Sequence, residues 1–173
     1  MGDIVTMDDL TNQEIVAVLD DAERLVPVAK GDVYLPLLQG KVLANMFFEN
    51  STRTRMSFET AMKRLGGSVL NFTSIGTSVA KGETLYDTMQ MIDGYADVAA
   101  IRHPRQGAAQ YSADAVEIPI LNAGDGAGNH PTQTMLDLFT IRQAHGTLEG
   151  LNVVLVGDLR YGRTVHSLSH ALV

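Results

Sequence analysis

The sequence predicts an α/β protein of three layers, in which helices cover both faces of a central parallel sheet. Short apolar runs alternate with stretches in which apolar residues recur every three or four positions. The first pattern is typical of strands buried on both faces, and the second of amphipathic helices. Because the two alternate along the chain, the strands should lie parallel, with the helices as crossover connections.

Buried strands are predicted where a short apolar run is bounded by polar or glycine-rich residues. The run KVLANMFF is one such strand, and it ends in a cluster of small and hydroxyl residues. The loops after the strands are polar at residues 74–83 and glycine-rich at residues 125–131. Strands are expected at residues 41–48, 68–73, 97–102, 118–124 and 151–158.

The predicted helices have recognisable ends. Thr11 and Glu14 can form a capping box, and Gly31 can end the helix that follows. Pro131 stands near the first position of another helix, where proline is favoured. Besides the helix that ends at Gly31, helices are expected at residues 52–65, 84–96, 106–115, 132–146 and 164–173.

Composition restricts the function. The 173 residues suit one domain, or one domain and part of another, and 45% hydrophobic residues suffice for a sizeable core. The excess of 20 acidic over 13 basic residues opposes general nucleic-acid binding. The chain has no cysteine, which excludes thiolate metal sites and disulfides and is compatible with a reducing compartment. It also shows no signal-peptide pattern and no apolar stretch near the ~20 residues of a membrane span. We therefore expect a cytoplasmic protein with neither nucleic-acid nor membrane partners.

The segment NSTRTR, residues 50–55, follows the first predicted strand and opens a helix. Ser51 is placed as its N-cap, and Arg53 and Arg55 stand in its first turn, where cations are unfavourable by about 0.3–1 kcal/mol each. A bound phosphate would reverse this cost, because helix N–H groups, hydroxyls and guanidinium groups would all point at one anion. The alternative is that both arginines bend away and pair with Glu49 or Glu59.

Further polar residues follow other strands. In parallel sheets ligands bind beyond the carboxyl ends of the strands, so Arg102, His130 and Gln133 are candidates for the same site. A neutral imidazole at a positive helix end can donate a hydrogen bond to a carbonyl oxygen. Arg102 could instead be the first solvated residue after its strand, and His130 only a helix N-cap.

Three candidates have weaker individual signals. Ser78 and Lys81 lie in the polar loop at residues 74–83, which could be no more than a solvated segment. Arg163 again places a cation at the start of a predicted helix. The five histidines are scattered, with no metal-binding motif, and no nucleophile–base pair is evident, so no metal or cofactor is expected.

The combination of FFENSTRTRMSFE, IRHP, HPTQTMLDLFTI and GDLRYGRTVHSL resembles the aspartate/ornithine carbamoyltransferase family over nearly the whole chain, in the family's order. Glu49 and YGRTVHSL favour the catalytic chain of the aspartate enzymes over the ornithine enzymes. The resemblance implies transfer of the carbamoyl group of carbamoyl phosphate to L-aspartate, a step of pyrimidine synthesis that needs no cofactor. It further implies a homotrimer, with a regulatory chain as a candidate partner.

The resemblance also assigns roles to the candidate residues. The catalytic residues would be Arg53, Thr54, Arg102, His130 and Lys81. Aspartate would be held by Arg163 and Lys81, and Ser78 and Lys81 would reach the site of a neighbouring subunit. Carbamoyl phosphate would be held by Ser51, Thr52, Arg53, Thr54, Arg102, His130, Gln133 and Ser78.

Chains of this family are nearly twice as long. We therefore expect a carbamoyl-phosphate-binding domain at residues 1–146, with only the first strand and helix start of an aspartate-binding domain at residues 147–173. The family's returning last helix would then be missing. Two other functions stay open: ornithine carbamoyltransfer, and a non-catalytic fragment that binds phosphate or a partner chain.

Overall fold

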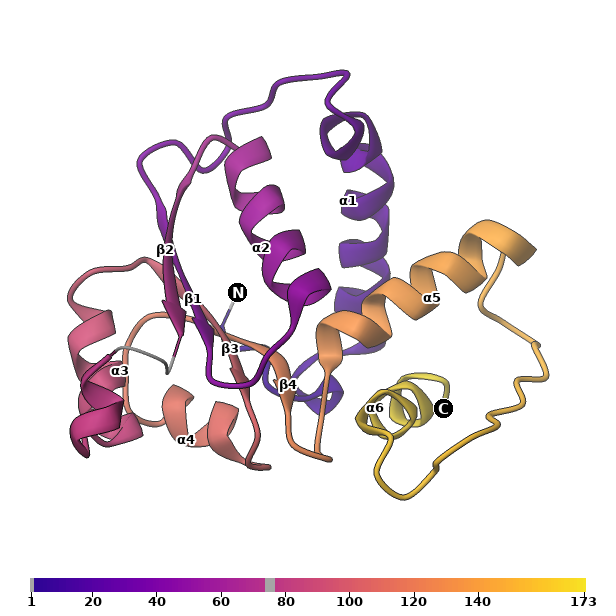
Figure 1. Cartoon of the computed structure of the whole chain (residues 1–173). Coiled ribbons are helices and arrows are strands. Elements are labelled where there is room, and N and C mark those ends of the chain that lie inside the picture. Colours follow the sequence, from indigo (N-terminus) through magenta and orange to yellow (C-terminus); the bar gives the residue numbers. More distant parts are fainter. Residues whose placement is uncertain (1, 74–76) are drawn as a thin grey trace.

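The computed structural model describes residues 2–73 and 77–173. Within these ranges four strands form one parallel sheet in the order β2-β1-β3-β4 (Figure 1). The parallel α/β sheet is thus confirmed, and four of the five predicted strands lie within two residues of their expected bounds. The strands are β1 (Val42–Phe47), β2 (Ser68–Thr73), β3 (Val98–His103) and β4 (Ile120–Asp125).

The first long helix begins and ends where the sequence places caps. Thr11 and Glu14 form the predicted capping box, and Gly31 ends the first helix with a φ of 85°. The predicted polar loop contains a short 3₁₀ turn, η2 (Ser78–Lys81), and its residues 74–76 lie outside the described residues. The other helices are η1 (Met7–Asp9), α1 (Asn12–Lys30), α2 (Thr52–Arg64), α3 (Leu85–Asp93), α4 (Ala108–Ala113), α5 (Pro131–His145) and α6 (Arg163–Ala171).

Alternate residues of each strand face opposite layers. Met46 of β1 packs in a core with Met89 of α3 and Ala109 of α4, whereas Leu43 packs in another core with Met62 of α2. Helices α3 and α4 therefore cover one face of the sheet and α2 covers the other, as Figure 1 shows. A third core joins η1, α1, α5 and α6.

The first residues of the described chain extend the sheet beyond β4. Ile4 forms a parallel bridge with Leu121, and its N–H donates to the carbonyl of Ile120. The Asp3 carboxylate accepts from the N–H of Ile120, so both the backbone and a side chain hold this segment. The outer edge of β4 is thereby partly covered.

The strand predicted at residues 151–158 is wrong. This stretch is extended but unpaired, and the residues Val154 and Val156 are 80% and 89% exposed. An apolar run becomes a strand only when a neighbouring strand takes up its N–H and C=O groups. In the described part of the chain no strand lies beside it.

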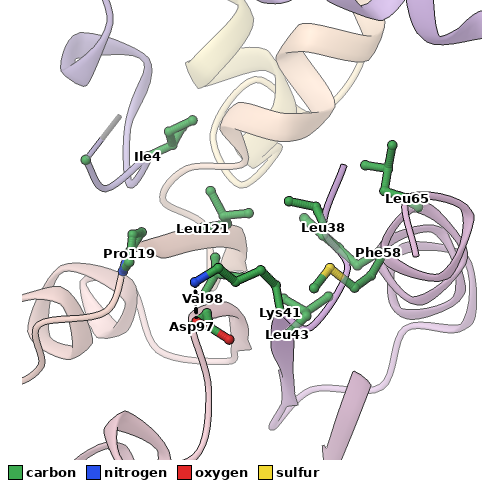
Figure 2. A pocket seen from close by; sticks show the side chains of 13 residues that line it. Ile4, Leu38, Lys41, Leu43, Phe58, Leu65, Asp97, Val98, Pro119 and Leu121 are labelled. Carbon is green, nitrogen blue, oxygen red and sulfur yellow. Dashed lines mark hydrogen bonds and ion pairs between the residues drawn. The ribbon is translucent and has the colours of Figure 1, made fainter. Parts of the chain in front are cut away.

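A cavity of about 560 Å³ lies between α2 and the beginnings of the strands. Apolar side chains line it, among them Leu43, Phe58 and Leu121, and Figure 2 shows the ion pair of Lys41 with Asp97 at its wall. Within the described ranges, no helix combines the length and apolar character that crossing a bilayer requires.

Candidate functional site

A second cavity, also of about 560 Å³, opens at the carboxyl ends of the strands. It lies where the chain order of the sheet reverses, since β1 is followed by β2 on one side and by β3 on the other. Ligands of open parallel sheets bind at this position. Of the residues predicted to form the site, Ser51, Arg53, Thr54, Arg102, His130, Gln133 and Arg163 line this cavity.

The first turn of α2 is not closed by its own side chains. Ser51 is the N-cap residue, but its side chain makes no capping hydrogen bond. Glu49 pairs with arginines outside this turn, and Glu59 pairs with Lys63 at 2.6 Å. Neither acid forms an ion pair with Arg53, whose exposed side chain makes no ion pair within the described ranges. The helix end therefore keeps its donors available for an anion.

Glu49 holds two arginines from distant parts of the chain. Its Oε1 accepts from Arg102 Nη2 at 2.9 Å and from Arg163 Nη2 at 3.2 Å, and its Oε2 accepts from Arg163 Nη1 at 3.3 Å. Arg102 also donates to the carbonyl of Ala123, and Arg163 to that of Gly126. One carboxylate is thus the shared counterion of two guanidinium groups at the cavity.

The charges in this cluster do not balance. Burial disfavours the Glu49 carboxylate, but the hydrogen bonds from Arg163 and Arg102 outweigh it and lower the pKa of Glu49. Burial and the nearby charge of Arg163 lower the pKa of Arg102. The Nε of Arg102 is buried and has no acceptor among the described residues. Two cations share one anion here, which favours a negatively charged ligand.

Gly124 makes room for both guanidinium groups. Its φ is 113°, a left-handed conformation that favours glycine. A Cβ atom here would lie 3.1 Å from Arg102 Nη1 and 3.2 Å from Arg163 Cζ. The end of β4 is thus shaped by the arginines that pack over it.

His130 occupies the N-cap of α5 and is only 5% exposed. Burial and the charges of Arg102 and Arg163 lower its pKa to about 4, so the ring is neutral at neutral pH. Its backbone N–H donates to Ser167 Oγ at 2.9 Å, which ties the start of α5 to α6. A neutral ring beside two arginines can donate to a carbonyl oxygen that gains negative charge.

Three predicted residues do not line this cavity. Ser78 and Lys81, the first and last residues of η2, are exposed and contribute nothing to its wall. Thr52 instead lines an adjacent hollow together with Ser51 and Arg55. Lys81 could therefore belong to such a site only if the loop that carries it came from another copy of the chain.

Sequence reasoning considered Glu49 as a partner of Arg53 and Arg55 and as a mark of the aspartate enzymes, but it missed the pairing of Glu49 with Arg102 and Arg163. A signal was present, because Glu49 follows β1 closely and so lies at the same edge of the sheet as Arg102. In the glycine-rich loop, glycine at position 126 serves the packing of the chain itself, because a Cβ there would lie 2.8 Å from the backbone of Pro104 and Gln106.

A family model matches most of the chain. The model is described as "Aspartate/ornithine carbamoyltransferase, carbamoyl-P binding domain" and matches residues 2–143. The aspartate carbamoyltransferase catalytic subunit of Archaeoglobus fulgidus is 53% identical over 173 residues, which cover 99% of this chain and 58% of the relative. That of Methanothrix thermoacetophila is 55% identical over 170 residues, 98% of this chain and 55% of the relative. The chain spans little more than half the length of these curated relatives.

Solved structures agree with the sequence relatives. Aspartate transcarbamoylase from Trypanosoma cruzi, in complex with carbamoyl phosphate and aspartate, superposes with a TM-score of 0.95 at 44% identity, covering 99% of this chain and 57% of that one. The catalytic subunit of Methanocaldococcus jannaschii aspartate transcarbamoylase gives 0.92 at 51% identity, covering 99% and 56%. With residues 2–143 matched by the family model, the chain belongs to the aspartate/ornithine carbamoyltransferase family through its carbamoyl-phosphate-binding domain.

Proposed function

We propose that this chain is the carbamoyl-phosphate half of a transferase that makes N-carbamoyl-L-aspartate and phosphate from carbamoyl phosphate and L-aspartate, a step of pyrimidine synthesis. The observation that carries the proposal is the cavity at which Arg53, Arg102, Arg163 and His130 converge on the open first turn of α2. The Trypanosoma cruzi relative with carbamoyl phosphate and aspartate supports the choice of substrates.

The proposed division of the chain follows the family. Residues 1–146 form the carbamoyl-phosphate-binding domain, and residues 147–173 begin the aspartate-binding domain. The family match to residues 2–143 supports this boundary. The unpaired stretch before α6 supports it as well, because an apolar segment without a sheet neighbour suits the first strand of another sheet.

The phosphate of the substrate would bind at the first turn of α2. Ser51, Thr52, Arg53 and Thr54 supply hydroxyls, a guanidinium group and the free N–H groups of the helix end. Arg102 would bridge the phosphate and the carbonyl oxygen, in part through its Nε, which lacks an acceptor within the described ranges. The substrate would compete with Glu49 for this guanidinium group.

The reaction needs orientation and charge stabilisation rather than a covalent catalyst. The amine nitrogen of aspartate attacks the carbonyl carbon, and negative charge develops on the carbonyl oxygen. Thr54, Arg102 and neutral His130 would donate hydrogen bonds to that oxygen. The carbon–oxygen bond to phosphate then breaks, and the departing phosphate takes the amine proton.

The remaining assignments concern the other ends of the substrates. Gln133, whose Nε2 donates to Asp137 at 3.0 Å, would contact the carbamoyl amino group. Arg163 would bind an aspartate carboxylate once it leaves Glu49. Favourable contacts at these positions would hold both reactants in line.

Ser78 and Lys81 complete the proposal only if a second copy supplies them. Both lie on η2 and do not line the cavity of their own chain. We therefore propose a homotrimer in which each η2 reaches the neighbouring site, acting in the cytoplasm, where the two substrates would be available. A regulatory chain stays a prediction of the resemblance.

The binding half of the proposal is tested with Arg53→Ala. Phosphate and carbamoyl phosphate affinities measured by calorimetry should fall by about 1.5–3 kcal/mol, the worth of a charged hydrogen bond. Arg24→Ala is the matched control, because Arg24 is an exposed arginine paired with Asp21 on α1. Equal phosphate affinities of Arg53→Ala and Arg24→Ala would contradict a phosphate site at the first turn of α2.

The shared site is tested by mixing variants of a version of the chain that carries the second domain of its relatives. Arg53→Ala and Lys81→Ala should each be nearly inactive alone, and mixing them should restore activity because a hybrid trimer contains intact sites. Mixing Ser78→Ala with Lys81→Ala is the control, since both changes damage the same donated loop. Absence of restoration despite proven subunit exchange contradicts the trimer arrangement.

The same assays also test a second candidate function. If phosphate binds and no transferase activity accompanies the binding, a phosphate-binding or assembly role is favoured instead. Supplying ornithine in place of aspartate tests the sister reaction.

A further inference from the structure

Asp125 is a buried acid to which none of the proposed roles refers. It is the last residue of β4 and is 3% exposed. Its Oδ1 accepts from the N–H of Asn129 at 2.7 Å and from Asn122 Nδ2 at 3.2 Å. Its Oδ2 accepts from the N–H of Gly107 at 2.8 Å. In the part of the chain that the structure describes, no ion pair compensates this carboxylate.

These hydrogen bonds join two of the segments that carry residues of the cavity. Asn129 immediately precedes His130, and Gly107 ends the loop that follows Arg102 at the end of β3. Asp125 therefore bridges the chain after one proposed catalytic residue and the chain before another. Asn122, its third donor, is itself held by the carbonyl of Val5 at 2.9 Å.

The backbone around Asp125 is also hydrogen-bonded and closely packed. The carbonyl of Asp125 accepts from the N–H of Gly128 at 2.9 Å, and its N–H donates to the carbonyl of Asn129. A Cβ at Gly128 would lie 2.8 Å from Asp125 Oδ1. The turn from β4 to α5 is thus closed around the carboxylate.

We propose that Asp125 is a positioning residue that fixes His130 relative to Arg102 across the cavity. The inference rests on the proposed function for the catalytic roles of these two residues. Asp125 itself would touch neither substrate.

The chemistry of the bridge predicts how substitution acts. Asparagine can keep one oxygen toward Asn129 and Asn122, but its NH₂ group then faces the N–H of Gly107, where two donors repel. The side-chain tie to the loop after Arg102 is lost, whereas the backbone bond from the N–H of Gly126 to the carbonyl of His103 remains. The volume of the side chain is unchanged. A misplacement of about 1 Å in such a site can cost roughly a hundredfold in rate.

Asp93→Asn is the matched control. Asp93 Oδ1 also accepts two backbone N–H groups, from Glu117 at 3.0 Å and Ile118 at 3.1 Å. It ends α3 and holds the chain before β4, at the opposite end of the sheet from the cavity. If Asp125 only stabilises the fold, Asp125→Asn and Asp93→Asn should therefore have similar effects.

Two measurements separate positioning from stability. In the 173-residue chain, the pH midpoint of the His130 ring signal by NMR should rise from about 4 in Asp125→Asn, because the loosened ring becomes hydrated. In the version that carries the second domain of its relatives, kcat should fall by roughly tenfold to a hundredfold, with a smaller change in the KM for carbamoyl phosphate. Asp93→Asn should change neither.

The outcomes are distinct. If Asp125→Asn behaves like Asp93→Asn in both measurements, the positioning role is wrong. If the parent protein has no transferase activity, the proposed function fails, and the His130 midpoint alone decides the position of the ring. Should Asp125→Asn not fold, Gly128→Ala displaces the carboxylate without removing it and should raise the midpoint in the same way.

Discussion

Transferase activity of the 173-residue chain should be lower by many orders of magnitude than that of a version carrying the second domain of its relatives. The cavity holds the proposed phosphate site, but only Arg163 and a donated Lys81 are available for aspartate. Fixing both reactants in line contributes about 7–11 kcal/mol to lowering the barrier, and most of this requires both domains.

Carbamoyl-aspartate formation by the two versions, at equal concentration and saturating substrates, measures this difference. Phosphate affinity is the internal control and should be similar in both, because the first turn of α2 is present in each. Turnover that differs by less than about tenfold, or ~1.4 kcal/mol, would show that the second domain matters little.

Acidification should destabilise the chain through His130. Its folded-state pKa of about 4 lies below the ordinary 6.5, so protons bind preferentially to the unfolded state. The stability from this group is fully present above pH 6.5 and is lost as pH falls from about 6.5 to 4. Over this window the loss should reach about 3 kcal/mol.

Urea unfolding at several pH values measures this slope, and His130→Gln should remove most of it. His103 contributes to the remaining slope, since burial and Arg105 lower its pKa as well. His145→Gln is the control, because His145 is exposed in the last turn of α5. An unchanged slope in His130→Gln would mean that the ring is not buried beside the arginines in solution.

The sheet and its helices could be predicted because burial leaves a periodic pattern in the sequence. The capping box at Thr11 and the glycine at position 31 could also be predicted, because each acts within a single turn of the chain. The stretch at residues 151–158 carries the same apolar pattern as β1, but strand formation depends on a neighbour that the pattern does not encode.

The location of the site could be predicted only from the rule that the carboxyl ends of parallel strands meet at one edge of the sheet. That rule placed Arg102 and His130 together, and both residues line the same cavity. It could not assign Glu49 to Arg102 and Arg163, because pairing depends on side-chain directions set by packing. The three hydrogen bonds of the Asp125 carboxylate likewise come from residues brought together only by the fold.

The bridge between Ile4 and Leu121 has a consequence for how the chain folds. Asp3 is separated by 117 residues from the N–H group that it binds, so the contact closes a very long loop. Closing such a loop in an otherwise unfolded chain costs about 4 kcal/mol of entropy. The β1–β2 and β1–β3 pairs join residues nearer in sequence and can form first. We therefore expect the N-terminal segment to dock against β4 late in folding, after the rest of the sheet has assembled.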